Sequence, residues 1–95
     1  MQIHIKVFGR VQGVGYRAWT VRQAKKLNLS GFVRNRRDKS VEIWAEGEIE
    51  AVNALLEMCK KGPSWARVDQ ILPQSFPDAP LPETKEGIFE SVGTV

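Results

Sequence analysis

The chain has 95 residues, of which 42% are hydrophobic and 26% are charged, and its formal net charge is +3. This length and composition predict one globular domain with a small core rather than a disordered chain. The sequence contains no run of about 18 apolar residues, so no membrane span is predicted. No secretory signal is recognised at its start, and the lone Cys59 cannot form an internal disulfide. We therefore expect a cytoplasmic protein.

The charge is divided unevenly along the chain. Residues 1–41 hold ten Lys and Arg residues and one acid, whereas residues 42–95 hold four Lys and Arg residues and ten acids. This asymmetry indicates that the first half faces an anion, such as a phosphate ester, a phosphoanhydride or nucleic acid. A solvated basic face without a ligand explains it equally well.

The N-terminal pattern predicts a strand, a loop and a helix. Apolar and polar residues alternate over 3–8, which is typical of a strand with one buried face. Three glycines over 9–15 interrupt the alternation. A helix is predicted from Arg17 to about Asn28, with an apolar face formed by Ala18, Val21, Ala24 and Leu27.

The next residues predict a hairpin and a second helix. Residues 30–35 and 40–45 have strand patterns, and the polar residues 36–39 between them predict a tight turn. The second helix follows Gly47 and ends at Gly62 before a proline, which is a typical stop signal. Its predicted apolar face consists of Ile49, Val52, Leu55, Leu56 and Cys59.

The C-terminal third is predicted to hold a fourth strand over 67–72. Residues 73–87 contain four prolines and are expected to form an irregular surface segment, and 88–92 are compatible with a short edge strand. The order βαββαβ predicts a single α+β domain over 1–95 with a ferredoxin-like sandwich, in which two helices cover one face of an antiparallel sheet. Right-handed crossovers place the two strands that precede helices in the centre.

The loop over 9–17 has the properties of an anion site. It enters the N-terminus of a helix, where unpaired N–H groups carry partial positive charge. Gly13 and Gly15 allow the backbone to curve around an anion, and Arg17 offers a forked cation for phosphate oxygens. A cation in the first helical turn opposes the helix dipole, so a bound anion explains Arg17 better than solvation does.

Two other phosphate-binding motifs are weighed and set aside. A Walker A loop needs Lys and Ser or Thr after its glycine, whereas Tyr16 and Arg17 follow Gly15. Residues 13–18 match the dinucleotide pattern G-x-G-x-x-A, and Asp38 follows at about the expected distance. However, that motif needs a parallel sheet of repeated βαβ units, which a chain of this length with a hairpin cannot build.

The segment Gly-Arg-Val-Gln-Gly-Val-Gly-Tyr-Arg at 9–17 resembles the signature of the acylphosphatase family. Gly-Phe-Val-Arg-Asn at 31–35, followed after four residues by Ser-Val-Glu-Ile at 40–43, resembles the family's second signature. The similarity extends over about 3–72. It implies a ferredoxin-like fold and hydrolysis of the carboxyl-phosphate anhydride of small acyl phosphates to carboxylate and inorganic phosphate, with no metal and no organic cofactor.

The resemblance also implies a role for each site residue. Arg17 matches the arginine that binds the phosphoryl group, and Asn35 matches the asparagine that orients the attacking water. Such a site must hold phosphoryl oxygens, offset charge and place a water in line, and an amide both accepts from and donates to water. The phosphate cradle would consist of the backbone N–H groups of Gln12, Gly13, Val14, Gly15 and Tyr16.

Several expectations concern single residues and partners. His4 is interpreted as a structural residue, Cys59 as a small core residue, and Trp65 as a packing or partly exposed aromatic. Lys39 departs from the family, which usually has glycine after the hairpin aspartate, and a lysine at positive φ costs about 1 kcal/mol. We expect a monomer whose partners are a small-molecule acyl phosphate and inorganic phosphate, with no nucleic acid and no membrane.

The main alternative is a non-catalytic nucleic-acid- or anion-binding ferredoxin-like module. RNA-recognition domains share this topology and the first half is basic, but their strand motif of exposed aromatics is absent. A regulatory domain derived from an acylphosphatase would have no need of Asn35. A domain of a carbamoyl-phosphate-processing maturation enzyme is disfavoured because the sequence ends at Val95.

Overall fold

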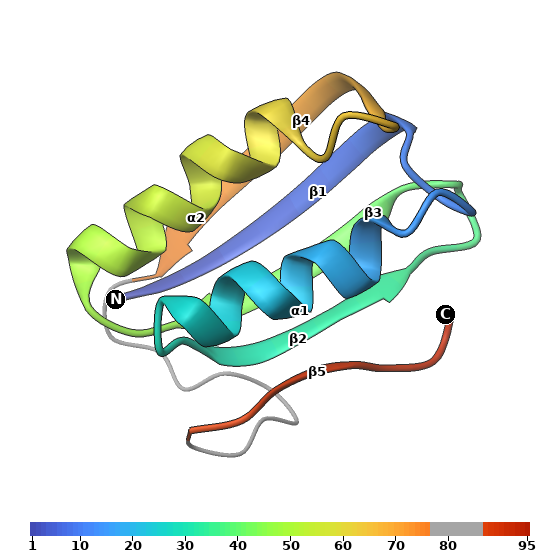
Figure 1. Cartoon of the computed structure of the whole chain (residues 1–95). Helices are drawn as coiled ribbons and strands as arrows, with labels where there is room; N and C mark the ends of the chain where they lie inside the picture. The colour runs from blue at the N-terminus through green and yellow to red at the C-terminus, as the bar shows by residue number, and fades with distance from the viewer. Residues whose placement is uncertain (77–86) are drawn as a thin grey trace.

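The computed structural model of the chain describes residues 1–76 and 87–95. Its sheet has the strand order β4-β1-β3-β2-β5, and both helices lie on one face of it (Figure 1). The strands that precede the helices, β1 and β3, are central, so the predicted α+β sandwich is confirmed. The elements are β1 (Gln2–Arg10), α1 (Tyr16–Lys26), β2 (Ser30–Asn35), β3 (Val41–Glu46), α2 (Ile49–Lys61), β4 (Arg67–Phe76) and β5 (Phe89–Ser91).

The fifth strand makes the sheet mixed. Strands β1 to β4 pair antiparallel, whereas β5 runs parallel to β2, with Ser91 opposite Val33. The pairing continues past β5, because Val92 N donates to Val33 O at 2.9 Å and Val95 N donates to Asn35 O at 3.3 Å. The expectation of a wholly antiparallel sheet is therefore wrong at this edge, where the C-terminal residues satisfy backbone groups that β2 would otherwise leave unpaired.

Strand β4 is longer than its sequence pattern predicted. It extends beyond residue 72 and includes Pro73, which lies opposite Ile5 of β1. Proline is tolerated in an edge strand, where its nitrogen can face away from the neighbouring strand. The prediction of irregular structure is thus wrong for 73–76, and residues 77–86 lie outside the described part of the chain.

The core lies between the sheet and the helices. Alternate residues of the two central strands point toward the helices, as their sequence pattern predicted. On α2, Val52, Leu55 and Cys59 are fully buried, whereas Ile49 is 53% exposed. The strand residues of this layer, all at most 1% exposed, are Ile3, Ile5, Val7, Val41, Ile43 and Ala45.

Helix α1 buries a stripe that only partly matches the predicted one: Ala24 is fully buried, and Val21 and Leu27 pack against the edge of the core. Ala18 is exposed and Val21 is only partly buried, while Tyr16, Thr20 and Ala24 form the buried face at four-residue spacing. Thr20 fits there because its hydroxyl donates to Tyr16 O at 2.9 Å, which satisfies a polar group that burial would otherwise penalise. Among the described residues, neither helix is long and apolar enough to cross a membrane.

The face of the sheet without helices carries a charged network around Glu42. Its carboxylate lies 2.7 Å from His4 Nε2 and accepts hydrogen bonds from Arg34 Nε at 2.6 Å and Arg36 Nη1 at 3.3 Å. Only 8% of the Glu42 side chain is exposed. Burial raises the pKa of Glu42, but the hydrogen bonds from His4 and Arg34 outweigh burial and lower that pKa below its ordinary 4.5.

This network predicts a pH-dependent contribution to stability. A folded-state pKa below the unfolded value stabilises the protein above the unfolded pKa, and the contribution is lost as the pH falls through the folded pKa. Glu42→Ala should therefore lower the free energy of unfolding by about 2–3 kcal/mol at neutral pH. Urea denaturation of variant and wild type from neutral pH downward should show this difference shrinking below pH 4.5.

Glu57→Ala is the matched control. Glu57 is 67% exposed and, among the residues described, pairs only with Lys60, three residues along α2, so its loss should change stability by less than about 0.5 kcal/mol. A Glu42→Ala difference that stays constant across the pH range would contradict the assignment.

Candidate functional site

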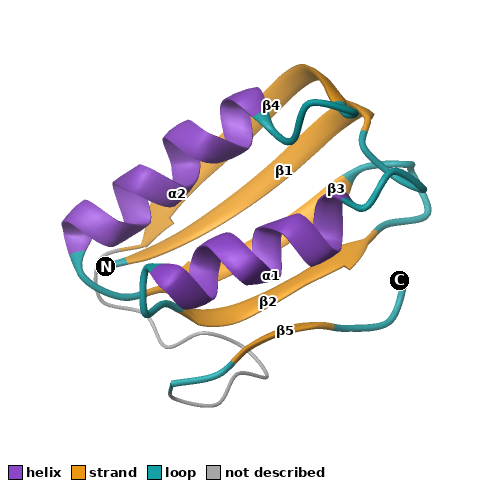
Figure 2. Ribbon diagram, in the orientation of Figure 1, coloured by secondary structure: helices purple, strands orange, loops and turns teal. Residues whose placement is uncertain are grey.

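The loop between β1 and α1 lies at the end of the sheet where the β2–β3 hairpin also turns (Figure 2). Gly13 and Gly15 adopt φ of +74° and +82°, the left-handed conformation that the predicted curvature of this loop requires. Gly15 is the N-cap of α1, no side chain caps the helix, and no acid lies in its first turn. The first amide N–H groups of α1 are therefore left without the usual side-chain acceptor.

A pocket of about 230 Å³ opens at this helix end. The Arg17 side chain is half-buried, and no carboxylate in residues 1–76 or 87–95 forms an ion pair with it. An uncapped helix N-terminus beside an unpaired guanidinium attracts anions. The residues that line the pocket are Val11, Gly13, Gly15, Tyr16, Arg17, Ala18 and Ser91.

The Gln12 side chain joins this loop to the hairpin. Its Nε2 donates to Arg36 O and to Ser40 O, both at 2.8 Å. The two acceptors lie at either end of the turn that follows Asn35, and Arg36 N also donates to Ser40 O at 2.9 Å. One amide group therefore holds the loop of Arg17 against the hairpin of Asn35, a contact that the sequence alone did not predict.

Asn35 is the last residue of β2 and shares the helix-facing side of that strand with Val33. Its Oδ1 is buried and accepts no hydrogen bond from any described residue. A buried amide oxygen without a partner is costly, and such atoms often mark a place for a water or a ligand. Asn35 is held next to the loop through Gln12, but it is not among the residues that line the Arg17 pocket.

The hairpin turn adopts the strained conformation that the departure of Lys39 from the family's glycine implied. Lys39 has φ of +78°, and the turn is held by Asp38, whose Oδ1 accepts from Ser40 N at 2.9 Å and from the Ser40 hydroxyl. Lys6 Nζ donates to Asp38 Oδ2 at 3.0 Å. Hydrogen bonds from Ser40, and then from Lys6, hold the pKa of Asp38 well below its usual range.

The Tyr16 phenol belongs to the core although Tyr16 is among the residues that line the pocket. The side chain is 1% exposed, and its hydroxyl donates to Cys59 O at 2.7 Å. Burial, followed by the neighbouring Cys59, raises the pKa of Tyr16 above its usual value. Burial also raises the pKa of Cys59 to about 12, so neither group is ionised near neutral pH, and the expectation that Cys59 is a core residue is confirmed.

Two neighbours of the loop were not predicted as site residues. Ser91 of β5 lines the Arg17 pocket, and a Cβ added at Gly15 would lie 3.4 Å from Trp65 Nε1. Both residues come from segments that are distant in sequence and reach the loop through strand pairing. No local motif signals such a placement.

Comparison with known proteins agrees with this fold. The acylphosphatase family matches residues 3–83. An acylphosphatase from Azorhizobium caulinodans is 54% identical over 69 residues, which cover 73% of this chain and 74% of that protein. One from Nitratidesulfovibrio vulgaris is 43% identical over 90 residues, which cover 93% and 90% of the two chains.

Solved structures show the same similarity. The acylphosphatase from Bacillus subtilis superposes with a TM-score of 0.86 at 37% identity and covers 96% of this chain and 97% of that one. Full-length HypF in its phosphate- and nucleotide-bound form matches with a TM-score of 0.82 at 33% identity, over 98% of this chain and 12% of HypF. The fold and the loop thus define a ferredoxin-like phosphohydrolase domain. The chain belongs to the acylphosphatase family and is an acylphosphatase hydrolase.

The Gln12 contact predicts a local effect of substitution. Gln12→Ala removes both hydrogen bonds and should lower the free energy of unfolding by about 1–2 kcal/mol. Amide hydrogen exchange should accelerate in both 9–17 and 36–40, because the two segments lose their mutual support. Gln23→Ala, at a half-buried glutamine of α1, is the control, and equal effects of the two substitutions would contradict the special role of Gln12.

The positive φ of Lys39 predicts a stabilising substitution. Lys39→Gly removes the Cβ that disfavours this conformation and should raise the free energy of unfolding by about 1 kcal/mol. Lys39→Ala removes the charge but keeps the Cβ, so it should bring no such gain. Chemical denaturation of both variants separates the two effects, and an equal gain in both would attribute the cost to charge rather than to backbone strain.

Proposed function

We propose that this acylphosphatase hydrolyses the carboxyl-phosphate anhydride of small acyl phosphates, with Arg17 binding the phosphoryl group and Asn35 orienting the attacking water. The observation that carries the proposal is the unpaired Arg17 guanidinium in a pocket at the uncapped start of α1. The Gln12 side chain supports the pairing of the two residues, because it ties this loop to the hairpin that follows Asn35.

The phosphoryl group would be held by charge and by backbone donors. In phosphoryl transfer the negative charge spreads over the three equatorial oxygens, so catalysis depends on positioning and electrostatic stabilisation. The Arg17 guanidinium can donate to two of these oxygens in its planar fork. The remaining donors in this scheme are the backbone N–H groups of Gln12, Gly13, Val14, Gly15 and Tyr16.

The water would approach from the hairpin side. The buried Oδ1 of Asn35 supports this role because it is free to accept a hydrogen bond from the water. The water oxygen forms a bond to phosphorus while the bond from phosphorus to the acyl oxygen breaks. The carboxylate leaves with that electron pair, and the protons of the water pass to the phosphate and to solvent. A carboxylate is a good leaving group, so the scheme needs no strong general acid.

The scheme includes neither a metal nor an organic cofactor. In the described part of the chain, no group of three or more His, Cys, Asp and Glu side chains could hold a metal ion. We further propose that the chain acts as a single domain over 1–95, as a cytoplasmic monomer, with acyl phosphate and inorganic phosphate as its partners and neither nucleic acid nor membrane among them.

The nucleic-acid-binding alternative finds little support on the face of the sheet without helices. Cations do lie over aromatic rings there, with Lys6 Nζ 5.4 Å from the Phe8 ring and the Arg34 guanidinium 5.2 Å from the Phe32 ring. However, Lys6 is paired with Asp38, and Arg34 is paired with a buried glutamate. Cations already neutralised by protein carboxylates are poorly placed to neutralise phosphates.

Substitution of the two proposed catalytic residues tests the function. Arg17→Ala should lower kcat/KM for acetyl phosphate by about a thousandfold or more, as loss of a phosphoryl-binding arginine does elsewhere. Asn35→Ala should lower kcat by about a hundredfold or more while inhibition by inorganic phosphate is kept. The assay is hydrolysis in the presence of EDTA, with circular dichroism to show that each variant is folded.

Arg22→Ala removes an exposed cation of the same helix and should retain wild-type activity. Wild-type turnover in Asn35→Ala would refute the water-orienting role. Failure of the wild-type protein to hydrolyse acetyl phosphate above background would refute the proposed function as a whole.

A further inference from the structure

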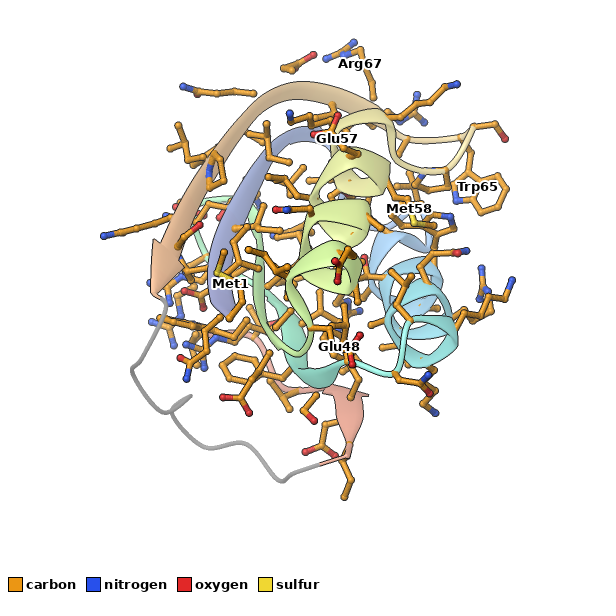
Figure 3. All side chains as sticks on the ribbon, turned by 90° about the vertical axis from the view of Figure 1, so that its left-hand side faces the viewer. Met1, Glu48, Glu57, Met58, Trp65 and Arg67 are labelled. Carbon is orange, nitrogen blue, oxygen red and sulfur yellow. The ribbon has the colours of Figure 1, made fainter. Side chains whose placement is uncertain are left out.

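Trp65 is a large apolar side chain that folding leaves in solvent next to the site. It is 55% exposed, more than any other large hydrophobic residue described, and Figure 3 shows it extending away from the ribbon at the turn between α2 and β4. The turn is firmly placed, since Pro63 is buried and Ala66 N donates to Pro63 O at 3.0 Å. The indole is therefore presented by a fixed support, and its Nε1 lies beside Gly15 of the phosphate loop.

The sheet order places Trp65 and Asn35 on opposite flanks of that loop. On one flank β1 pairs with β4, with Arg10 opposite Arg67, so the turn that carries Trp65 ends beside the loop. On the other flank β1 pairs with β3, and the hairpin that follows Asn35 is bound to the loop by Gln12. The loop that leaves β1 thus lies between the α2–β4 turn, which carries Trp65, and the β2–β3 hairpin, which follows Asn35 (Figure 1).

Because phosphoryl transfer is in line, this arrangement predicts on which side of the loop the leaving group lies. The attacking and leaving oxygens lie on opposite sides of phosphorus. This inference rests on the function proposed above, in which Asn35 holds the water on the hairpin flank. The acyl group must then project from the β4 flank. That is the flank on which the Trp65 indole is exposed.

We propose that Trp65 packs against the acyl group of the substrate, and that this contact makes the rate depend on the apolar area which that group presents. An indole offers a rigid apolar face and favourable contact with a second ring. An acetyl group presents a single methyl and covers little of that face. Trp65 is therefore a residue that selects between substrates and not one that acts on phosphorus.

The test compares two substrates in four proteins. Hydrolysis of benzoyl phosphate and of acetyl phosphate is measured for the wild type, Trp65→Ala, Trp65→Phe and Ile49→Ala. Trp65→Ala should lower kcat/KM for benzoyl phosphate about three- to tenfold, mainly through KM, because one aromatic contact is lost. Its kcat/KM for acetyl phosphate should stay within about twofold, and Trp65→Phe should recover most of the loss.

Ile49→Ala is the matched control. Ile49 is similarly exposed, at 53%, but it begins α2 at the far end from Trp65, so its removal should affect neither substrate. Equal losses on both substrates, or wild-type values for both in Trp65→Ala, would overturn the acyl contact while the hydrolase remains. Wild-type protein inactive on both substrates would instead overturn the proposed function.

Discussion

The hydrogen bonds from the Gln12 side chain are the contact on which the site depends most directly. The proposed phosphate cradle and the proposed water-orienting residue belong to separate segments, and strand pairing alone leaves the loops beyond the strand ends free to move. Because Nε2 donates to both Arg36 O and Ser40 O, the loop and the hairpin are held at one separation. Catalysis by positioning requires such a fixed separation, since small displacements of reacting groups cost much of the rate.

Strand order supplies the rest of the geometry. With β1 between β4 and β3, the loop that leaves β1 is flanked by the α2–β4 turn and by the β2–β3 hairpin. Right-handed crossovers make this arrangement the usual one for βαββαβ chains. The parallel pairing of β5 with β2 then brings Ser91 to the pocket at the start of α1. A few residues on each of four segments thereby surround one helix N-terminus.

What could be predicted from the sequence was mainly what local patterns determine. The alternation in 3–8 and 40–45 and the glycines before α1 follow from residue types and their spacing. The positive φ of Lys39 was expected only because the family that the chain resembles usually has glycine at that position. The role of Asn35 rests on family resemblance, because an asparagine at a strand end has no local signal for chemistry. The placement of Ser91, of Trp65 and of both acceptors of the Gln12 amide depends on which distant segments lie beside the loop. Local periodicity does not say which segments pair.

The shortage of acids in the first half of the chain helps to explain why no described carboxylate pairs with Arg17. The first 42 residues hold ten Lys and Arg residues but only two acids, and both acids are engaged elsewhere. Asp38 binds Lys6 and caps the hairpin turn, and Glu42 is enclosed by His4, Arg34 and Arg36 on the face without helices. With these carboxylates occupied, no described acid competes for Arg17, and the positive potential at the start of α1 remains available to an anionic substrate.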